Sequence, residues 1–418
     1  MHFTLRHHVF YRRYSFFNLS DNQDIIFFVV FQLIKRIEKK EMTKFAHRVE
    51  GIEISGIRKA FEAFSGEFFN LGLGEPDFDT PEHIKEAAMQ ALKSGFTSYT
   101  FNKGIEELRE AISDKFKRYN GFVANPDEII VTSGASEALH IAILSVVEKG
   151  DEVLIPNPGF VSFAALTKLA EGKPVGVPLS EDLTMSVEDL KERLTDKTKA
   201  MIINSPANPT GAVESEENIK AIVDVANDHH ITIISDEVYE QLIYDGLKHI
   251  SPARFSDEVI TVNAVSKTYA MTGFRLGYLA AREEYVEQML KIHQYIQACA
   301  SSISQKAALA AITGPQECVV EMRNEFKRRR DFAVDVLRDM GMEFNTPKGA
   351  FYIFPRVGDE KEFVEKLRRR RIIVTPGSTF GSRGKNHVRI SYATSFEKLK
   401  RAFELIYSLL GEGGRGAL

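Results

Sequence analysis

Between residues 128 and 262 the chain alternates short, continuously apolar segments with segments of helical periodicity, and this alternation restricts the fold more than any other feature. Strands buried on both faces are apolar along their whole length, and parallel neighbours must be joined by a crossover, usually a helix. The sequence therefore predicts an α/β fold in which a mainly parallel sheet is sandwiched by helices. The predicted strands are residues 128–132, 152–155, 175–177, 200–203, 231–234 and 259–262.

Polar and small residues follow directly after four of these strands, at 133–136, 204–208, 235–239 and 264–267. In open parallel sheets, ligands bind outside the carboxyl ends of the strands. Because parallel strands end at the same edge of the sheet, the four segments are expected to meet there. The sequence predicts a ligand site at this edge.

The chain has 418 residues, which is enough for two domains with separate cores. We assign residues 85–315 to a large domain that contains the sheet. Residues 316–412 are assigned to a smaller α+β domain, with predicted strands at 351–354, 372–374 and 388–392. Residues 42–84 are expected to pack against the smaller domain.

Three local predictions concern helices. Thr80 is predicted to cap a helix whose first residue is Pro81. A long helical region is predicted to run from Ala281 to Ile312. The basic run 327–330 is predicted to be a solvated helix face.

Residues 1–41 differ from the rest of the chain, because they are rich in aromatic residues, Arg and His without a steady period. The apolar run 25–34 is too short to span a bilayer, and basic residues rather than a small-residue cleavage site follow it. We interpret residues 1–41 as a disordered or upstream extension, with Met42 as the native start. No association with a membrane is expected.

Overall charge and cysteine content narrow the class of partners. The formal net charge of −4 gives no reason to expect nucleic acid or an anionic membrane as a partner. The two cysteines, Cys299 and Cys318, cannot form a disulfide framework or a zinc site, which fits a reducing cytoplasm. No metal is predicted.

Lys267 follows the last predicted strand, with Ser266 beside it and Arg275 eight residues later. An amine held in a pocket can lose its proton and form a Schiff base with an aldehyde, while a hydroxyl and a planar guanidinium suit a phosphate. An aldehyde and a phosphate together suggest pyridoxal 5'-phosphate. The alternative for so short a motif is a solvated lysine and a surface ion pair.

Gly134, Ala135 and Ser136 lie at a predicted strand-to-helix turn. Small residues there leave backbone N–H groups and the positive helix end facing outward, which is a seat for phosphate. Many strand-to-helix turns that bind no phosphate have the same pattern.

Asp236 ends a predicted strand, and a carboxylate is the direct means of keeping a pyridine nitrogen protonated. Tyr239 and Asn208 could donate hydrogen bonds to the phenolic oxygen of such a ring, and Phe160 could stack on it. The alternatives are a helix cap or Mg²⁺ ligand for Asp236, a simple turn around Asn208 and a core position for Phe160.

Six segments occur in the order typical of one family: L-G-x-G-E-P-D-F-x-T-P, S-G-A-S-E-A-L, N-P-T-G, S-D-E-V-Y, S-K-x-x-x-M-T-G-F-R-L-G and V-R-I-S-Y-A. Through them the chain, from Met42 to about Leu410, resembles the pyridoxal-phosphate-dependent aminotransferases of fold type I. The group concerned is class I/II, which includes the aspartate, aromatic and alanine aminotransferases.

The resemblance implies a role for each matching residue. Lys267 forms the internal Schiff base with the cofactor and carries protons, and Asp236 pairs with the pyridine nitrogen. Asn208 and Tyr239 hold the phenolic oxygen, and Phe160 stacks on the ring. The residues implied for phosphate binding are Gly134, Ala135, Ser136, Ser266 and Arg275.

The resemblance also implies how the substrate is held. Arg389 binds the α-carboxylate in a bidentate pair, with Gly74 closing over the substrate and Asn208 beside it. Tyr99 reaches the phosphate of the neighbouring subunit, which implies a homodimer with shared active sites.

Two residues depart from the family pattern. Ala264 stands where many relatives have a hydroxyl three residues before the lysine, so phosphate binding depends more on Ser266 and Arg275. Phe160 stands where some relatives have Trp or Tyr, which keeps stacking but removes a hydrogen-bonding group.

The implied activity is that of a cytoplasmic aminotransferase of amino acid metabolism, with a biosynthetic role. An L-amino acid, with aspartate as the leading candidate, gives its amino group to a 2-oxo acid such as 2-oxoglutarate. The cofactor alternates between pyridoxal and pyridoxamine phosphate in a ping-pong sequence. Alternatives left open are aromatic or alanine aminotransfer, a β-lyase or decarboxylase, and an aminotransferase-like sensor domain.

Overall fold

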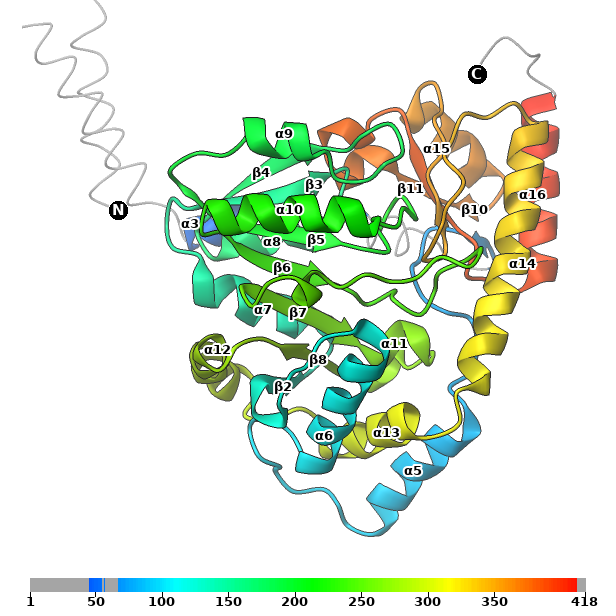
Figure 1. Cartoon of the computed structure of the whole chain (residues 1–418). Coiled ribbons are helices and arrows are strands. Elements are labelled where there is room, and N and C mark those ends of the chain that lie inside the picture. The colour runs from blue at the N-terminus through cyan, green and yellow to red at the C-terminus, as the bar shows by residue number, and fades with distance from the viewer. Residues whose placement is uncertain (1–44, 55, 57–66, 412–418) are drawn as a thin grey trace, which may run out of the picture. The chain divides into compact units, whose positions relative to one another are not determined.

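The structure is a computed structural model, and it describes residues 45–54, 56 and 67–411 (Figure 1). The chain divides into two compact units, Met1–Gly51 and Ile52–Leu418. In the first unit the described residues form the single turn α3 (His47–Glu50). The predicted extension 1–41 lies outside the described residues.

A seven-stranded sheet forms the centre of the second unit, in the order β2-β8-β7-β6-β5-β3-β4. Every neighbouring pair is parallel except those made by β8, which is antiparallel to both β2 and β7. The mainly parallel sheet is thus confirmed, although β8 was not predicted. The strands are β2 (Ile129–Thr132), β3 (Glu152–Asn157), β4 (Lys173–Pro178), β5 (Thr198–Asn204), β6 (Thr232–Asp236), β7 (Val259–Ala264) and β8 (Gly277–Ala280).

Helices cover both faces of this sheet, as the alternation within β5 illustrates. Ile202 packs into one core cluster with α7 (Ala135–Val146), α8 (Val161–Leu169) and α12 (Glu283–Ile296). Met201 and Ile203, on either side of it, pack into the opposite cluster with α9 (Val187–Glu192) and α10 (Glu216–Asp228). Successive side chains of a strand point to opposite faces, so a strand between two helical layers must be apolar throughout.

A third group of helices packs around β2. It comprises α5 (Glu82–Lys93), α6 (Glu106–Lys115) with the π-helical turn η1 (Phe116–Asn120), and α13 (Ser302–Thr313). Two local predictions change here. Thr80 does not cap α5, because its hydroxyl donates to the Ala270 carbonyl at 2.7 Å. The helical region after Ala281 is two helices, α12 and α13, and Ala298 between them has a positive φ of 62°.

The C-terminal part contains α14 (Glu317–Asp339), α15 (Glu360–Arg369) and α16 (Phe396–Gly411), and α14 packs along α16 (Figure 1). Its strands are β9 (Tyr352–Ile353), β10 (Ile372–Ile373), β11 (Thr375–Pro376) and β12 (Val388–Ser391), with β12 between β11 and β9. β1 (Phe69–Asn70) pairs with β10. The proposed division at residues 84 and 315 stays a prediction.

Short helical turns complete the described elements. They are α11 (Val265–Thr268), η2 (Pro126–Glu128), η3 (Pro252–Arg254), η4 (Thr272–Phe274), η5 (Gly377–Phe380) and η6 (Ser382–Gly384). Among the described residues, none of the helices combines the length and apolar character that a bilayer crossing needs.

The basic run on α14 is only partly solvated. Arg330 is 3% exposed, and its two terminal nitrogens bind the carboxylate of Asp245 at 2.6 and 2.9 Å. Arg329 is 5% exposed, and its Nη1 lies 2.5 Å from Asp77. The predicted solvated face is therefore wrong for these two residues, because acidic partners distant in sequence allow them to be buried.

Candidate active site

Lys267 lies at the carboxyl edge of the sheet, in α11, which begins directly after β7 ends at Ala264. Its Nζ donates a hydrogen bond to the carbonyl oxygen of Gly74 at 2.7 Å. Burial lowers the pKa of the Lys267 amine to about 8, because the charged form loses its hydration. A larger share of this amine is therefore unprotonated near neutral pH than of a solvated lysine, as a nucleophile requires.

Asp236 is the last residue of β6, the strand beside β7, and is 4% exposed. Burial raises the pKa of its carboxyl group to about 7. Its Oδ1 accepts a long hydrogen bond from the Val238 N–H, at 3.4 Å. A cation placed against Asp236 would restore the charged form of this carboxyl group.

Arg389 comes from β12 and is 1% exposed. Its Nη1 donates to Oδ1 of Asn208 at 2.8 Å, and its Nη2 donates to the Gly72 carbonyl. Its Nε has no hydrogen-bond partner among the described residues. The guanidinium carbon lies 4.4 Å from the ring centre of Tyr352 and 4.9 Å from that of Phe380. A buried guanidinium bonded to neutral oxygens is suited to bind an anion.

Tyr239 and Tyr352 join these groups. Both rings are buried, and their hydroxyl oxygens lie 2.7 Å apart. A Cβ at Gly74 would overlap the Tyr352 hydroxyl, so only glycine fits there. Tyr352 is a site residue that sequence analysis treated only as part of a strand. The sequence feature that could have pointed to it is a tyrosine in a buried strand, because a buried tyrosine hydroxyl needs a hydrogen-bond partner.

The turn between β2 and α7 forms the other end of the site. Gly134 has a positive φ of 85°, and a Cβ on it would lie 2.6 Å from Nη2 of Arg275. Ala135 and Ser136 open α7, so their N–H groups have no partner within the helix. Ser136 and Arg275 are exposed, whereas Ser266 is buried. The turn and the guanidinium together offer an anion backbone donors and positive charge.

Residues 66–406 match the protein-family model described as aminotransferase class I and II. The chain belongs to this family. The aminotransferase is 48% identical over 368 residues to a probable aspartate aminotransferase of Methanocaldococcus jannaschii, a match that covers 86% of this chain and 98% of the relative. These comparisons favour amino-group transfer over the alternative activities.

Two further relatives differ in the substrates that their names state. Aromatic-amino-acid aminotransferase 2 of Thermococcus litoralis is 45% identical, over 87% of this chain and 98% of the relative. The solved aspartate aminotransferase of Thermus thermophilus with maleate superimposes with a TM-score of 0.84 at 37% identity, covering 88% of this chain and all of that one. The fold type I assignment is confirmed.

Class I/II aminotransferases use pyridoxal 5'-phosphate, and the residues described above fit this cofactor. The charged form of the buried Asp236 carboxyl group is favoured by a cationic partner, which a protonated pyridine nitrogen provides. The opening N–H groups of α7 and the exposed Arg275 guanidinium can bind an anion, which a phosphate provides. Lys267 offers an amine that can lose its proton.

Phe160 and Tyr99 are the two remaining predicted site residues of the aminotransferase. Phe160 is partly buried and packs edge-on against Phe163, with ring centres 5.7 Å apart. Tyr99 is 87% exposed in the loop before α6. Their predicted roles stay predictions.

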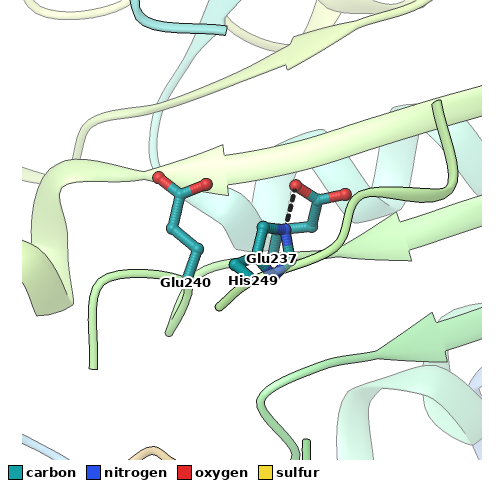
Figure 2. Close-up of side chains that lie close together, drawn as sticks. All are labelled: Glu237, Glu240 and His249. Carbon is teal, nitrogen blue, oxygen red and sulfur yellow. Dashed lines mark hydrogen bonds and ion pairs between the residues drawn. The ribbon is translucent and has the colours of Figure 1, made fainter. Parts of the chain in front are cut away.

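A buried polar cluster consists of Glu237 and Glu240, which lie in the turn after β6, and His249 (Figure 2). Three such groups could hold a metal ion by their spacing. However, the Lys115 ammonium forms an ion pair with Glu240, and the Asn120 amide donates to both carboxylates, at 2.9 and 2.7 Å. The acidic groups thus already have a cation and hydrogen-bond donors from the protein, and the cluster fixes the turn after β6.

Proposed function

We propose that the aminotransferase transfers the amino group of L-aspartate to a 2-oxo acid such as 2-oxoglutarate, with Lys267 as its proton carrier. The observation that carries the proposal is that the Lys267 amine, with its lowered pKa, lies at the same sheet edge as the buried Asp236 and near Arg389. Aspartate is favoured because the Methanocaldococcus and Thermus relatives bear that name.

When bound, pyridoxal 5'-phosphate supplies a carbonyl carbon that accepts an amine and a ring that withdraws electrons from the amino acid's α-carbon. Lys267 would hold the cofactor through its aldehyde and would be released when the substrate amine takes its place. The free Nζ would then act as the base that accepts the proton of the substrate α-carbon and as the acid that returns it to the cofactor carbon on the other side of the shared nitrogen. The Gly74 carbonyl, 2.7 Å from Nζ, keeps the amine in this position.

Asp236, Tyr239 and Asn208 form what we call the ring end of the site. Asp236 keeps the ring nitrogen protonated, and Tyr239 and Asn208 hold the phenolic oxygen. All three side chains are buried, so each hydrogen bond to the ring acts in a medium of low dielectric.

Arg389 binds the substrate's α-carboxylate. Its Nε has no partner in the described part of the chain, and burial lowers the pKa of the guanidinium, so an incoming carboxylate gains a donor and stabilises the guanidinium charge. Its hydrogen bond to Asn208 connects the carboxylate site with the ring end.

Residues 133–136, Ser266 and Arg275 form the phosphate end, and Tyr99 of a second subunit completes it in a homodimer. Tyr99, Phe101 and Tyr295 are 87%, 77% and 88% exposed, and the Asn102 amide ties the Tyr99 loop to the Ala298 carbonyl beyond α12. Exposed aromatic groups of this size commonly mark an interface between proteins. We assign the enzyme to the cytoplasm and to amino acid biosynthesis.

A panel of amino donors with 2-oxoglutarate tests the substrate. Aspartate is expected to give the highest kcat/KM, and parallel initial-rate lines are expected for two-substrate kinetics. Aromatic aminotransfer is the second candidate, because the Thermococcus relative bears that name. A higher kcat/KM for phenylalanine or tyrosine than for aspartate would reverse the assignment. Intersecting lines would exclude the ping-pong sequence.

A further inference from the structure

A buried histidine–glutamate pair lies directly behind the phosphate end. His293 of α12 is fully buried, and its Nδ1 lies 2.7 Å from Oε1 of Glu137, the third residue of α7. Glu137 is 9% exposed. Neither residue has a place in the reaction described above.

Each member of the pair also holds backbone that belongs to the site. The other carboxylate oxygen of Glu137 accepts the Ser133 N–H at 2.5 Å, which fixes the start of the phosphate turn. His293 Nε2 lies 2.9 Å from the carbonyl oxygen of Asn102, three residues after Tyr99. One pair thus connects the phosphate turn with the loop that carries Tyr99.

The protons of this arrangement follow from its partners. A carbonyl oxygen only accepts hydrogen bonds, so Nε2 of His293 must carry a hydrogen toward Asn102. The carboxylate of Glu137 already accepts the Ser133 N–H. The short contact between Nδ1 and Oε1 therefore needs one shared proton, and with that proton the pair has no net charge.

Neutralisation matters because Glu137 lies in the first turn of the helix that receives the phosphate. A buried carboxylate without a counter-charge would repel a phosphate at this helix end. We propose that His293 and Glu137 are positioning residues for phosphate binding: Glu137 fixes the turn, and His293 cancels its charge while anchoring the Tyr99 loop. This proposal rests on the proposed phosphate end.

The test compares the dissociation constants of pyridoxal 5'-phosphate and pyridoxal, which lacks the phosphate, on coenzyme-free enzyme. His293→Gln is expected to weaken pyridoxal 5'-phosphate about tenfold or more, because a buried carboxylate is left unpaired. Pyridoxal should change less than about twofold, since its contacts are at the ring end. Adding Glu137→Gln to His293→Gln should recover most of the loss, because the uncompensated charge is then removed.

The chain provides a matched control. His249 and Glu237 also form a buried pair with 2.7 Å between Nε2 and a carboxylate oxygen (Figure 2), and Glu237 directly follows Asp236 of the ring end in the sequence. His249→Gln should leave the ratio of the two dissociation constants within about twofold of the parent. The ratio is the dissociation constant of pyridoxal divided by that of pyridoxal 5'-phosphate. If His249→Gln lowers this ratio as much as His293→Gln does, a general loss of rigidity in the protein explains the effect and the proposal fails.

The remaining outcomes separate this proposal from the phosphate assignment. Arg275→Ala must weaken pyridoxal 5'-phosphate selectively; if it does not, the phosphate end itself is wrong. Two results would overturn only the positioning role, provided that Arg275→Ala weakens pyridoxal 5'-phosphate selectively. One is that His293→Gln weakens the binding of both ligands equally. The other is that adding Glu137→Gln to His293→Gln does not restore the binding of pyridoxal 5'-phosphate. Should His293→Gln not fold, Glu137→Gln and Glu137→Ala decide together. The amide can accept from Ser133 and donate to His293, so the dissociation constant of pyridoxal 5'-phosphate must stay within about threefold of the parent. Alanine removes both contacts and must weaken pyridoxal 5'-phosphate selectively; if it does not, the positioning role is overturned.

Discussion

The ring end and the phosphate end of the site are built in opposite ways. At the ring end, Asp236, Tyr239 and Asn208 are 4%, 4% and 6% exposed. At the phosphate end, Ser136 and Arg275 are exposed, and Tyr99 is 87% exposed. In the described chain the three groups of the proposed ring end are all buried, whereas the proposed phosphate end combines the buried Ser266 with groups exposed to solvent.

Because of this difference in burial, we expect the two ends to contribute to different steps, the ring end to the chemical step and the phosphate end to cofactor binding. Burial perturbs the pKa of Asp236 and Lys267, so substitutions of these groups should change the chemical step. Exposed groups act through charge and hydrogen bonds in water, so substitutions at the phosphate end should change mainly cofactor affinity. Four experiments test this separation, beginning with the largest expected effect.

Lys267→Ala should lower kcat by about 10⁴-fold, because no other described amine holds this position to move the proton. The measurement is steady-state transamination together with the yellow absorbance of the lysine-bound cofactor, which should vanish. Added cofactor should still bind, since the phosphate end is unchanged. A variant that transaminates as fast as the parent would disprove the assigned role.

Asp236→Asn should lower kcat/KM by about 10²- to 10³-fold, because the ring nitrogen loses its charged partner. It should also stabilise the coenzyme-free protein above pH 7. The pKa of the Asp236 carboxyl group in the folded chain is about 7, above its value of 3.8 when solvated. The cost in stability therefore builds up as the pH rises from about 4 to about 7, is complete above about 7, and is absent below about 4.

The check is a melting curve of the coenzyme-free protein at pH 4.5 and pH 8.5. Asn at position 236 should raise the melting temperature at the higher pH and have little effect at the lower one. An equal shift at both pH values would show that the buried charge is not the cause.

The rate at which Lys267 of the coenzyme-free enzyme captures pyridoxal 5'-phosphate should rise about tenfold between pH 7 and pH 9. The reactive form is the free amine, and the pKa of Lys267 is about 8. Stopped-flow absorbance at several pH values measures the midpoint. A midpoint near 10.5 would mean that the amine is solvated, and the contrast between the two ends would lose its physical basis.

Tyr99→Phe should weaken cofactor binding about three- to fivefold, because it removes one hydrogen bond supplied by a second subunit. Tyr295→Phe is the matched control, since Tyr295 is equally exposed, at 88%, but has no predicted contact with the phosphate. The dissociation constant of the cofactor should be measured at protein concentrations above and below the one at which the dimer separates. The two values should differ for the parent protein and not for Tyr99→Phe. Equal effects of the two substitutions would remove Tyr99 from the site.

Much of the fold could be predicted from local patterns. The strands of the central sheet were found because burial on both faces makes them continuously apolar. β8 was missed because Gly277–Ala280 is short and follows a glycine-rich turn, so neither length nor periodicity marks it. The break between α12 and α13 was missed because Ala298 adopts a positive φ that alanine rarely has.

The site was predictable where several residues lie close in sequence, as around Lys267 and Asp236. It was not predictable where partners are distant. His293 meets Glu137 across 156 residues, and Arg329 meets Asp77 across 252. In the sequence, polar residues at such positions cannot be distinguished from surface residues, because their partners are brought near them only by the fold. Tyr352 is the same case, because its partner Tyr239 is 113 residues away.

The antiparallel direction of β8 has a consequence for how this active site can be rebuilt. β7 runs toward the edge that carries the chemistry, and β8 returns from it, so the connection from 265 to 276 never leaves that edge. Lys267 and Arg275 are thus parts of one hairpin bend rather than of two separate crossovers. A graft of this bend into another parallel sheet would transfer both groups together, but only into a host with room for a reversed strand.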